Sequence, residues 1–238
     1  MTTLFPPGII VSCQALKDEP LYGDSVMAKM ALAAVQGGGV AIRANSPEDI
    51  TTIRAAVDVP IIGLYKVAYS DSPVYITPTP SEVTAVVAAG ADIVALDATH
   101  RPRPDLHSIQ ALIDLIHDHG RLVLADVSTA DEGVDAERLG CDLVSTTLSG
   151  YTDGTRHRRL PDLILLASLI ESVSVPVLAE GGISFPEQVY ECFELGAYGV
   201  VIGSAITRPQ IITRRFVDAY RSWRIRKISR PVQLDPRN

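Results

Sequence analysis

Eight short apolar segments recur along the chain, and they constrain its fold more than any other feature. They comprise residues 9–13, 40–43, 61–65, 93–96, 122–125, 143–145, 177–179 and 200–202. Each segment is continuously apolar rather than alternating, which is typical of strands buried on both faces of a parallel sheet covered by helices.

Helical patterns separate these segments. In the clearest one, Ile109, Leu112, Ile113 and Ile116 follow the i, i+3, i+4, i+7 spacing of an amphipathic helix. A glycine also marks the expected end of three helices, at Gly90, Gly140 and Gly196.

Capping residues predict where several helices begin. Ser46 and Thr79 each place a hydroxyl at the N-cap, with proline next and a carboxylate in the first turn. Ser184 with Glu187 predicts a capping box ahead of a later helix.

Eight strands alternating with about eight helices predict a single-domain α/β fold, a (β/α)₈ TIM barrel, for a chain of 238 residues. We expect the barrel over residues 1–226 and a polar, irregular tail at 227–238, whose order stays open. No linker or composition shift divides the chain.

The net charge of −7 argues against a broad nucleic-acid or anionic-membrane surface, although a small anionic substrate is still allowed. Cys13, Cys141 and Cys192 are odd in number and have no CxxC spacing, so they predict neither disulfides nor a zinc site and fit a reducing cytoplasm. Since no apolar window reaches about 20 residues, we expect a soluble intracellular protein.

Polar residues follow the predicted strands, at the end where barrel active sites lie. They are Ser12, Gln14, Arg43, Asn45, Lys66, Asp97, Asp126, Thr146, Thr147, Glu180, Gly203 and Ser204. Charged groups at the ends of five apolar strands are costly unless they are paired or used. An ion-pair network that closes the barrel is the alternative, and it is strongest for Asp97 and Asn45.

Two glycine-bearing turns point to a phosphate ligand. Gly181-Gly182 follows the seventh strand and Gly203-Ser204 the eighth, where many barrels bind phosphate on backbone N–H groups. Arg208 could add a charge-assisted contact. Tight-turn geometry alone is the alternative explanation for these glycines.

Lys66 is the strongest candidate for proton transfer. Burial and the nearby Arg43 are expected to lower its pKa toward neutrality, so it could act as a base or form a Schiff base. A purely anion-binding lysine is the alternative. Glu180 and Asp126 could orient hydroxyls or shuttle protons.

Other polar residues give weaker signals. His117 and His119 form a pair without a third ligand, which indicates solvated side chains rather than a metal site. His100 is expected in a loop. Residues 101–104 predict a stiff loop over the barrel mouth, and whether an arginine there faces the substrate stays open.

Several segments together resemble the N-acetylmannosamine-6-phosphate 2-epimerase family. They are residues 10–16, 42–45, 71–79, 95–99, 101–104, 146–152, 179–183 and 203–209. The match extends from about residue 8 to 220, and its specificity lies in the order and spacing of the motifs. Residues 66–69 and His100 depart from the commoner family pattern, which leaves the loop contacts there open.

This resemblance implies a cofactor-independent (β/α)₈ isomerase of amino-sugar and sialic acid breakdown. Such an enzyme interconverts N-acetylmannosamine 6-phosphate and N-acetylglucosamine 6-phosphate, without a metal and usually as a homodimer. The implied catalytic residues are Lys66 and Glu180, the substrate-binding residues Gln14, Arg43 and Asp126, and the phosphate-binding residues Gly182, Gly203, Ser204 and Arg208. From their positions after the sixth and seventh strands, we also expect Thr147 to bind substrate and Gly181 to bind phosphate.

Inversion at C2 requires removal of the proton next to an open-chain aldehyde and its return on the other face. We expect Glu180 to assist ring opening, Lys66 to move the C2 proton, and Arg43 with Gln14 to stabilise the enolate or hold the N-acetyl group. Two alternatives stay open, a Schiff-base aldolase that uses Lys66 and a non-catalytic sugar-phosphate sensor.

Overall fold

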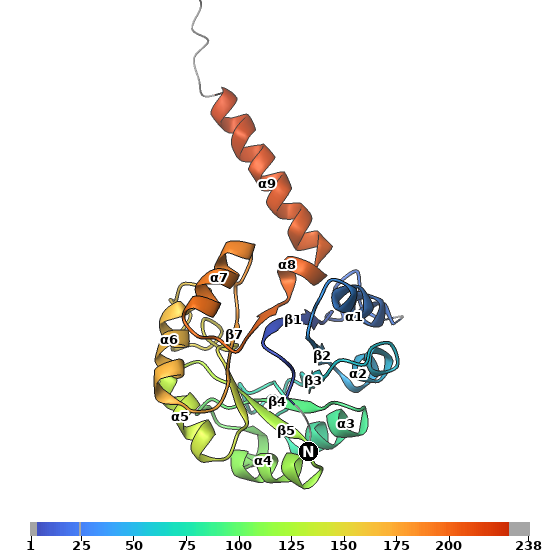
Figure 1. Cartoon of the computed structure of the whole chain (residues 1–238), viewed down its shortest axis with the longest axis vertical. Helices are drawn as coiled ribbons and strands as arrows, with labels where there is room; N and C mark the ends of the chain where they lie inside the picture. The colour runs from blue at the N-terminus through green and yellow to red at the C-terminus, as the bar shows by residue number, and fades with distance from the viewer. Residues whose placement is uncertain (1–3, 24, 229–238) are drawn as a thin grey trace, which may run out of the picture.

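Eight parallel strands form a closed barrel in the computed structural model, which describes residues 4–23 and 25–228 (Figure 1). The strands pair in chain order and β8 closes on β1. Their bounds are β1 Gly8–Cys13, β2 Ala41–Asn45, β3 Ile61–Leu64, β4 Ile93–Asp97, β5 Leu122–Asp126, β6 Leu143–Ser145, β7 Val177–Glu180 and β8 Gly199–Ile202. The predicted (β/α)₈ fold is confirmed.

Helices surround this barrel. They are α1 Val26–Gln36, α2 Pro47–Arg54, α3 Pro80–Ala88, α4 Ile109–Asp118, α5 Ala130–Arg138, α6 Leu163–Ser172, α7 Pro186–Glu194, α8 Ser204–Thr207 and α9 Pro209–Ile228, with a short 3-10 turn at Pro104–Leu106. The Ser46 and Thr79 side chains cap α2 and α3 as predicted, and the three helix-end glycines all have positive φ.

One predicted cap is wrong in detail. Phe185, not Ser184, occupies the N-cap of α7, because Pro186 takes the first helical position. The side-chain oxygen of Gln188 accepts from the backbone N–H groups of Ser184 and Phe185, so Glu187 does not supply the capping acceptor. The Ser184 hydroxyl is therefore left to the loop that precedes the helix, where it donates to the Gly182 carbonyl.

Alternation along the strands builds two cores. On β5, Leu122 and Leu124 belong to the inner cluster, whereas Val123 and Ala125 pack outward against the helices. Nearer the carboxyl end, the next inward position becomes polar on most strands. It changes from Ile10 to Ser12, from Ala41 to Arg43, from Leu124 to Asp126, from Leu143 to Ser145 and from Leu178 to Glu180. The period of two therefore delivers polar side chains to one end of the barrel.

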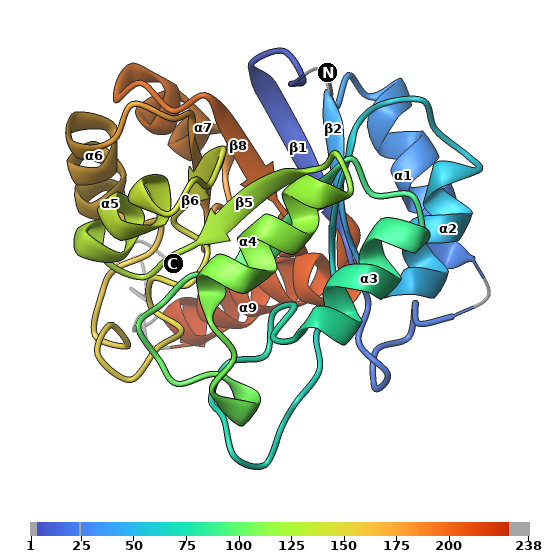
Figure 2. The ribbon, with the colours of Figure 1, turned by 90° about the horizontal axis from the view of Figure 1, so that it is seen from below.

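The loops after β3 and β4 extend past the strand ends at this side of the molecule (Figure 2). Helix α9 leaves the barrel beside α8 and projects away from it (Figure 1). It continues as a helix to Ile228, two residues into the segment expected to be irregular, and the remainder of that segment, 229–238, lies outside the described residues.

Candidate active site

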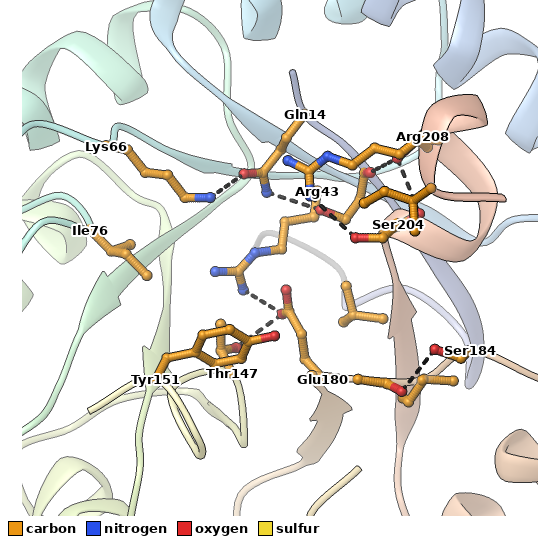
Figure 3. Close-up of a pocket in the computed structure, with 18 of the residues that line it drawn as sticks. Gln14, Arg43, Lys66, Ile76, Thr147, Tyr151, Glu180, Ser184, Ser204 and Arg208 are labelled. Carbon is orange, nitrogen blue, oxygen red and sulfur yellow. Dashed lines mark hydrogen bonds and ion pairs between the residues drawn. The ribbon is translucent and has the colours of Figure 1, made fainter. Parts of the chain in front are cut away.

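A cavity of about 410 Å³ opens at the carboxyl ends of the strands. This volume lies within the range of small-molecule sites, roughly 300 to 1,000 Å³. Most of the predicted site residues line it, namely Ser12, Gln14, Arg43, Lys66, Thr147, Glu180, Gly181, Gly182, Gly203, Ser204 and Arg208. Figure 3 shows that Lys66 and Arg43 approach the cavity from one side, while Ser184 and Ser204 lie on the other.

Arg43 is the centre of the charged cluster. Its Nη1 and Nη2 atoms donate to the two carboxylate oxygens of Asp126 at 3.0 and 2.5 Å, and Nη1 lies 3.0 Å from Glu180 Oε2. Burial lowers the pKa of Arg43, but the Asp126 and Glu180 carboxylates outweigh it and raise that pKa. The guanidinium thus stays charged in the barrel interior.

Asp126 is predicted as a substrate contact, but it is fully buried and is not among the residues that line the cavity. It accepts hydrogen bonds from Arg43 and from the Thr147 hydroxyl, at 2.6 Å in the latter case. In this structure Asp126 therefore fixes the side chains of Arg43 and Thr147, which line the cavity, without lining it itself.

Thr147 lies between the carboxylates of Asp126 and Glu180. Its single hydroxyl lies 2.6 Å from Asp126 Oδ1, 3.0 Å from Glu180 Oε2 and 2.8 Å from Ser145 Oγ. A hydroxyl has one proton to donate, so it cannot satisfy two ionised carboxylates at once. Burial, together with the charge of Asp126, raises the pKa of Glu180. Glu180 therefore shares the Thr147 hydroxyl with Asp126, and its pKa lies above the ordinary value for a glutamate.

Lys66 follows β3 and its Nζ donates to Gln14 Oε1 at 2.8 Å, while Gln14 Nε2 donates to Ser12 Oγ at 3.0 Å. Asn45 Oδ1 accepts from the Lys66 backbone N–H and fixes the start of the loop. Burial, followed by repulsion from the Arg43 charge, lowers the pKa of Lys66 to about 8. About a tenth of Lys66 is therefore a neutral amine at pH 7, and about half of it at pH 8.

The opposite end of the cavity is formed by the loops after β7 and β8. Gly182 has φ of 71°, and a Cβ there would lie 2.3 Å from the Leu160 Cβ, so the turn requires glycine. Arg208 Nη1 donates to Ser204 Oγ at 3.2 Å, and Arg208 Nε lies 2.6 Å from Glu19 Oε1. The residues predicted to bind phosphate thus lie together at this end of the cavity.

Sequence reasoning missed several residues that line the cavity. They are Tyr75, Ile76, Tyr151, Ile183, Ser184, Val201, Thr207, Ile211 and Arg215. Most of them belong to loops or to α9, where no periodic pattern indicates which side chain points inward. Only the positions of Ile183 and Ser184, the two residues after the glycine pair, gave a usable signal.

Other polar residues at the strand ends lie outside the cavity. Arg101 pairs with Asp97 at 2.6 Å, and Arg103 donates to the Asp97 carbonyl, so neither arginine lines the cavity. His100 lies 3.0 Å from Asp135 on α5, and His117 pairs with Asp142.

Within residues 4–23 and 25–228, no group of three or more His, Cys, Asp or Glu side chains could hold a metal ion, and no helix has the length and hydropathy needed to cross a bilayer. Cys13, Cys141 and Cys192 are free and buried.

A family model and two relatives that match this chain carry nearly the same description. Residues 27–222 match the family described as "Putative N-acetylmannosamine-6-phosphate epimerase". A relative from Clostridium perfringens strain SM101 is 50% identical over 210 residues, which are 88% of this chain and 95% of the relative. One from Caldanaerobacter subterraneus subsp. tengcongensis is 52% identical over 212 residues, 88% of this chain and 90% of the relative. Both relatives are named putative N-acetylmannosamine-6-phosphate 2-epimerases.

One solved structure is from a protein of the same description, and another shares only the fold. The N-acetylmannosamine-6-phosphate 2-epimerase from Clostridium perfringens superimposes with a TM-score of 0.87 at 49% identity, over 89% of this chain and 92% of that one. Thiamine phosphate pyrophosphorylase from Pyrococcus furiosus has a TM-score of 0.60 at 20% identity, over 90% of this chain and 96% of that one, which is a likeness of fold alone.

Proposed function

Because the chain belongs to the N-acetylmannosamine-6-phosphate 2-epimerase family, we propose that it is a cofactor-independent isomerase that interconverts N-acetylmannosamine 6-phosphate and N-acetylglucosamine 6-phosphate. The observation that carries this proposal is the pairing of a buried lysine of lowered pKa with a carboxyl group of raised pKa in one cavity. Such a pair supplies a base and an acid at the same pH.

Glu180 acts in ring opening. Its raised pKa supports a protonated carboxyl that gives its proton to the ring oxygen, while the anomeric hydroxyl releases its own proton to solvent water. This step produces the open-chain aldehyde, which makes the C2 proton acidic.

Lys66 then removes the C2 proton as a neutral amine and returns it to the opposite face. The resulting enolate carries negative charge on the former aldehyde oxygen, and the buried Arg43 guanidinium offers a fixed positive charge in the same cavity. Gln14 holds the Lys66 amine through its side-chain oxygen and can also contact the N-acetyl group.

The phosphate binds at the other end of the cavity, on the loops that contain Gly181, Gly182, Gly203 and Ser204, with Arg208 beside them. Anchoring the phosphate leaves the sugar carbons free to move between the two proton transfers. We therefore assign the enzyme to the breakdown of amino sugars, including those released from sialic acid.

A Schiff-base aldolase is a second candidate, because the lowered pKa of Lys66 also suits nucleophilic attack on a carbonyl. Borohydride reduction in the presence of substrate separates the two. An aldolase leaves a covalent adduct on Lys66, whereas the epimerase leaves none.

The decisive experiment is a proton NMR time course in deuterated water with N-acetylmannosamine 6-phosphate. We expect N-acetylglucosamine 6-phosphate to appear with deuterium at C2. Lys66→Ala should lose this activity and still bind the sugar phosphate, and Glu180→Ala should slow the C2 exchange. Lys29→Ala removes an exposed lysine on α1 and is the matched control.

Failure of the wild-type protein to form product would favour the non-catalytic sensor. Wild-type turnover by Lys66→Ala would remove Lys66 from the mechanism, and unaltered exchange in Glu180→Ala would remove Glu180.

A homodimer is the partner state that we propose, and the outer face of α9 supports it. Phe216, Tyr220 and Trp223 follow i, i+4, i+7 spacing and are 74%, 57% and 54% exposed. An apolar stripe of this kind usually marks a protein interface. Light scattering should give twice the chain mass, and Phe216→Asp with Tyr220→Asp should give monomers.

The cytoplasm is the compartment that we propose. Three buried free thiols fit a reducing environment, and a phosphorylated sugar is an intracellular metabolite.

A further inference from the structure

The phosphate end of the cavity contains a second arginine whose charge, unlike that of Arg208, is not already neutralised. Arg208 forms a two-point ion pair with Glu19, since its Nε lies 2.6 Å from Oε1 and its Nη2 donates to Oε2 at 3.0 Å. Gln210 Nε2 and the Leu16 backbone N–H also donate to this carboxylate. Arg208 and Glu19 together therefore contribute almost no net charge to an incoming phosphate.

Arg215, at the start of α9, lines the same end of the cavity. Its Nη1 donates to the Ser184 carbonyl at 3.1 Å, its Nη2 donates to Ser184 Oγ at 2.9 Å, and its guanidinium lies 5.7 Å from the centre of the Phe185 ring. All of these partners are neutral. Among the described residues, no carboxylate forms an ion pair with Arg215.

From this contrast we propose that Arg215 is the phosphate-binding residue that supplies the net positive charge, while Arg208 is held by Glu19 as a neutralised hydrogen-bond donor. The inference rests on the proposed sugar-phosphate substrate and adds a binding residue from α9 to it. A phosphate carries about −1.5 to −2 charges at pH 7, which backbone N–H groups alone leave unbalanced.

The geometry also explains how Arg215 is held ready. A guanidinium has five N–H donors in a planar fork, and the contacts with Ser184 use only two of them. The remaining donors are available for phosphate oxygens. Ser184 lies two residues after Gly182 in the same loop, so the arginine is fixed beside the loop that offers backbone N–H groups.

A purely structural role is the competing explanation, in which Arg215 only tethers the loop through Ser184. The phosphate-binding role and the structural role predict different effects on phosphorylated and unphosphorylated ligands. A phosphate contact affects only ligands that carry a phosphate, whereas a misplaced loop weakens binding of the unphosphorylated sugar as well.

The test compares Arg215→Gln with Arg214→Gln, its exposed neighbour, so that both variants lose one positive charge. Binding of inorganic phosphate is measured by calorimetry at fixed ionic strength, and KM and kcat are measured with N-acetylmannosamine 6-phosphate. We expect Arg215→Gln to weaken phosphate binding and raise KM by about tenfold or more, with kcat within about threefold of wild type. Arg214→Gln should match the wild type.

Two further variants sharpen the result. Arg215→Lys keeps the charge but not the fork, so it should recover part of the phosphate affinity. Glu19→Gln keeps an acceptor for the Leu16 N–H and removes the charge that neutralises Arg208, so it should tighten phosphate binding.

Unchanged phosphate affinity in Arg215→Gln would overturn the proposal. So would an equal loss of affinity for unphosphorylated N-acetylmannosamine, measured as a competitive inhibitor, because it would reveal the structural role. If the wild-type protein fails to epimerise the sugar, the calorimetry with inorganic phosphate still decides the role of Arg215, so the two failures are distinguishable.

Discussion

Two arginine–aspartate pairs lie at neighbouring strand ends of this barrel, and they differ in where the arginine comes from. Asp97 ends β4 and Asp126 ends β5, in register with each other, and both carboxylates are fully buried. Asp126 pairs with Arg43 on β2, 83 residues away in the chain. Asp97 pairs with Arg101, only four residues away.

Asp97 and Asp126 therefore differ in what their hydrogen bonds hold in place. The partners of Asp97 all come from its own loop, since Thr99 donates both its N–H and its hydroxyl to Oδ1 and Arg101 donates to Oδ2. The partners of Asp126 are Arg43 on β2 and Thr147 in the loop after β6, and both line the cavity. Asp126 therefore positions side chains that face the cavity, whereas Asp97 positions only its own loop.

The largest expected effect comes from breaking the Asp126 pair. Asp126→Asn removes the charge that balances Arg43 and replaces one of its two acceptor oxygens with an NH₂ group, so kcat should fall about a hundredfold. Steady-state kinetics on purified protein of verified fold measure this. Activity within a few-fold of wild type would mean that Glu180 alone positions Arg43.

The matching variant on the other pair is Asp97→Asn. Its amide NH₂ group would face the donors of Arg101, so we expect a loss of about 2 kcal/mol in unfolding free energy. Because no partner of Asp97 reaches the cavity, kcat should stay within about threefold. Urea denaturation and steady-state kinetics on one preparation test both statements. A kcat as low as that of Asp126→Asn would show that the Asp97–Arg101 pair affects activity as much as the Asp126–Arg43 pair does.

The sequence predicts the strands well because continuous apolar runs and helix-end glycines are local signals. The polar strand ends are predicted for a related reason, since the period of two along each strand places residues such as Arg43 and Glu180 inward at the same end. The fold and most of the site therefore follow from patterns within single strands.

What the sequence does not predict depends on contacts between elements. Asp97 and Asp126 are equivalent strand-end residues in the sequence, and only the path of the loop that carries Arg101 distinguishes them. Arg215 is likewise one of several arginines on α9, and its entry into the cavity depends on the direction of that helix. The N-cap of α7 is Phe185 rather than Ser184 because Pro186 takes the first helical position.

The pH profile of kcat/KM should also differ between variants of Asp126 and Asp97. Proton abstraction needs neutral Lys66, whose pKa is about 8, so kcat/KM should rise about tenfold per pH unit below 8 and level off above it. The Asp126 charge raises the Lys66 pKa, so Asp126→Asn should move the inflection to lower pH. Asp97→Asn should leave it in place.

These profiles are best recorded above pH 7, where the substrate phosphate is largely dianionic. A wild-type profile that is flat between pH 7 and 9 would show that Lys66 is not the base.

The smallest expected effect concerns stability, and it contrasts the buried lysine of the cavity with a lysine outside it. The folded-state pKa of Lys66 is about 8 and its ordinary value is 10.5, so burying the ammonium costs stability fully below pH 8, and this cost disappears as the pH rises toward 10.5. Lys66→Met should therefore be more stable than wild type by about 1 kcal/mol at pH 7. The gap should close between pH 8 and 10.5 in urea denaturation, and Lys29→Met should show no such gap. A gain that does not depend on pH would instead reflect better packing of the methionine, and it would show that burial of the Lys66 ammonium carries no penalty.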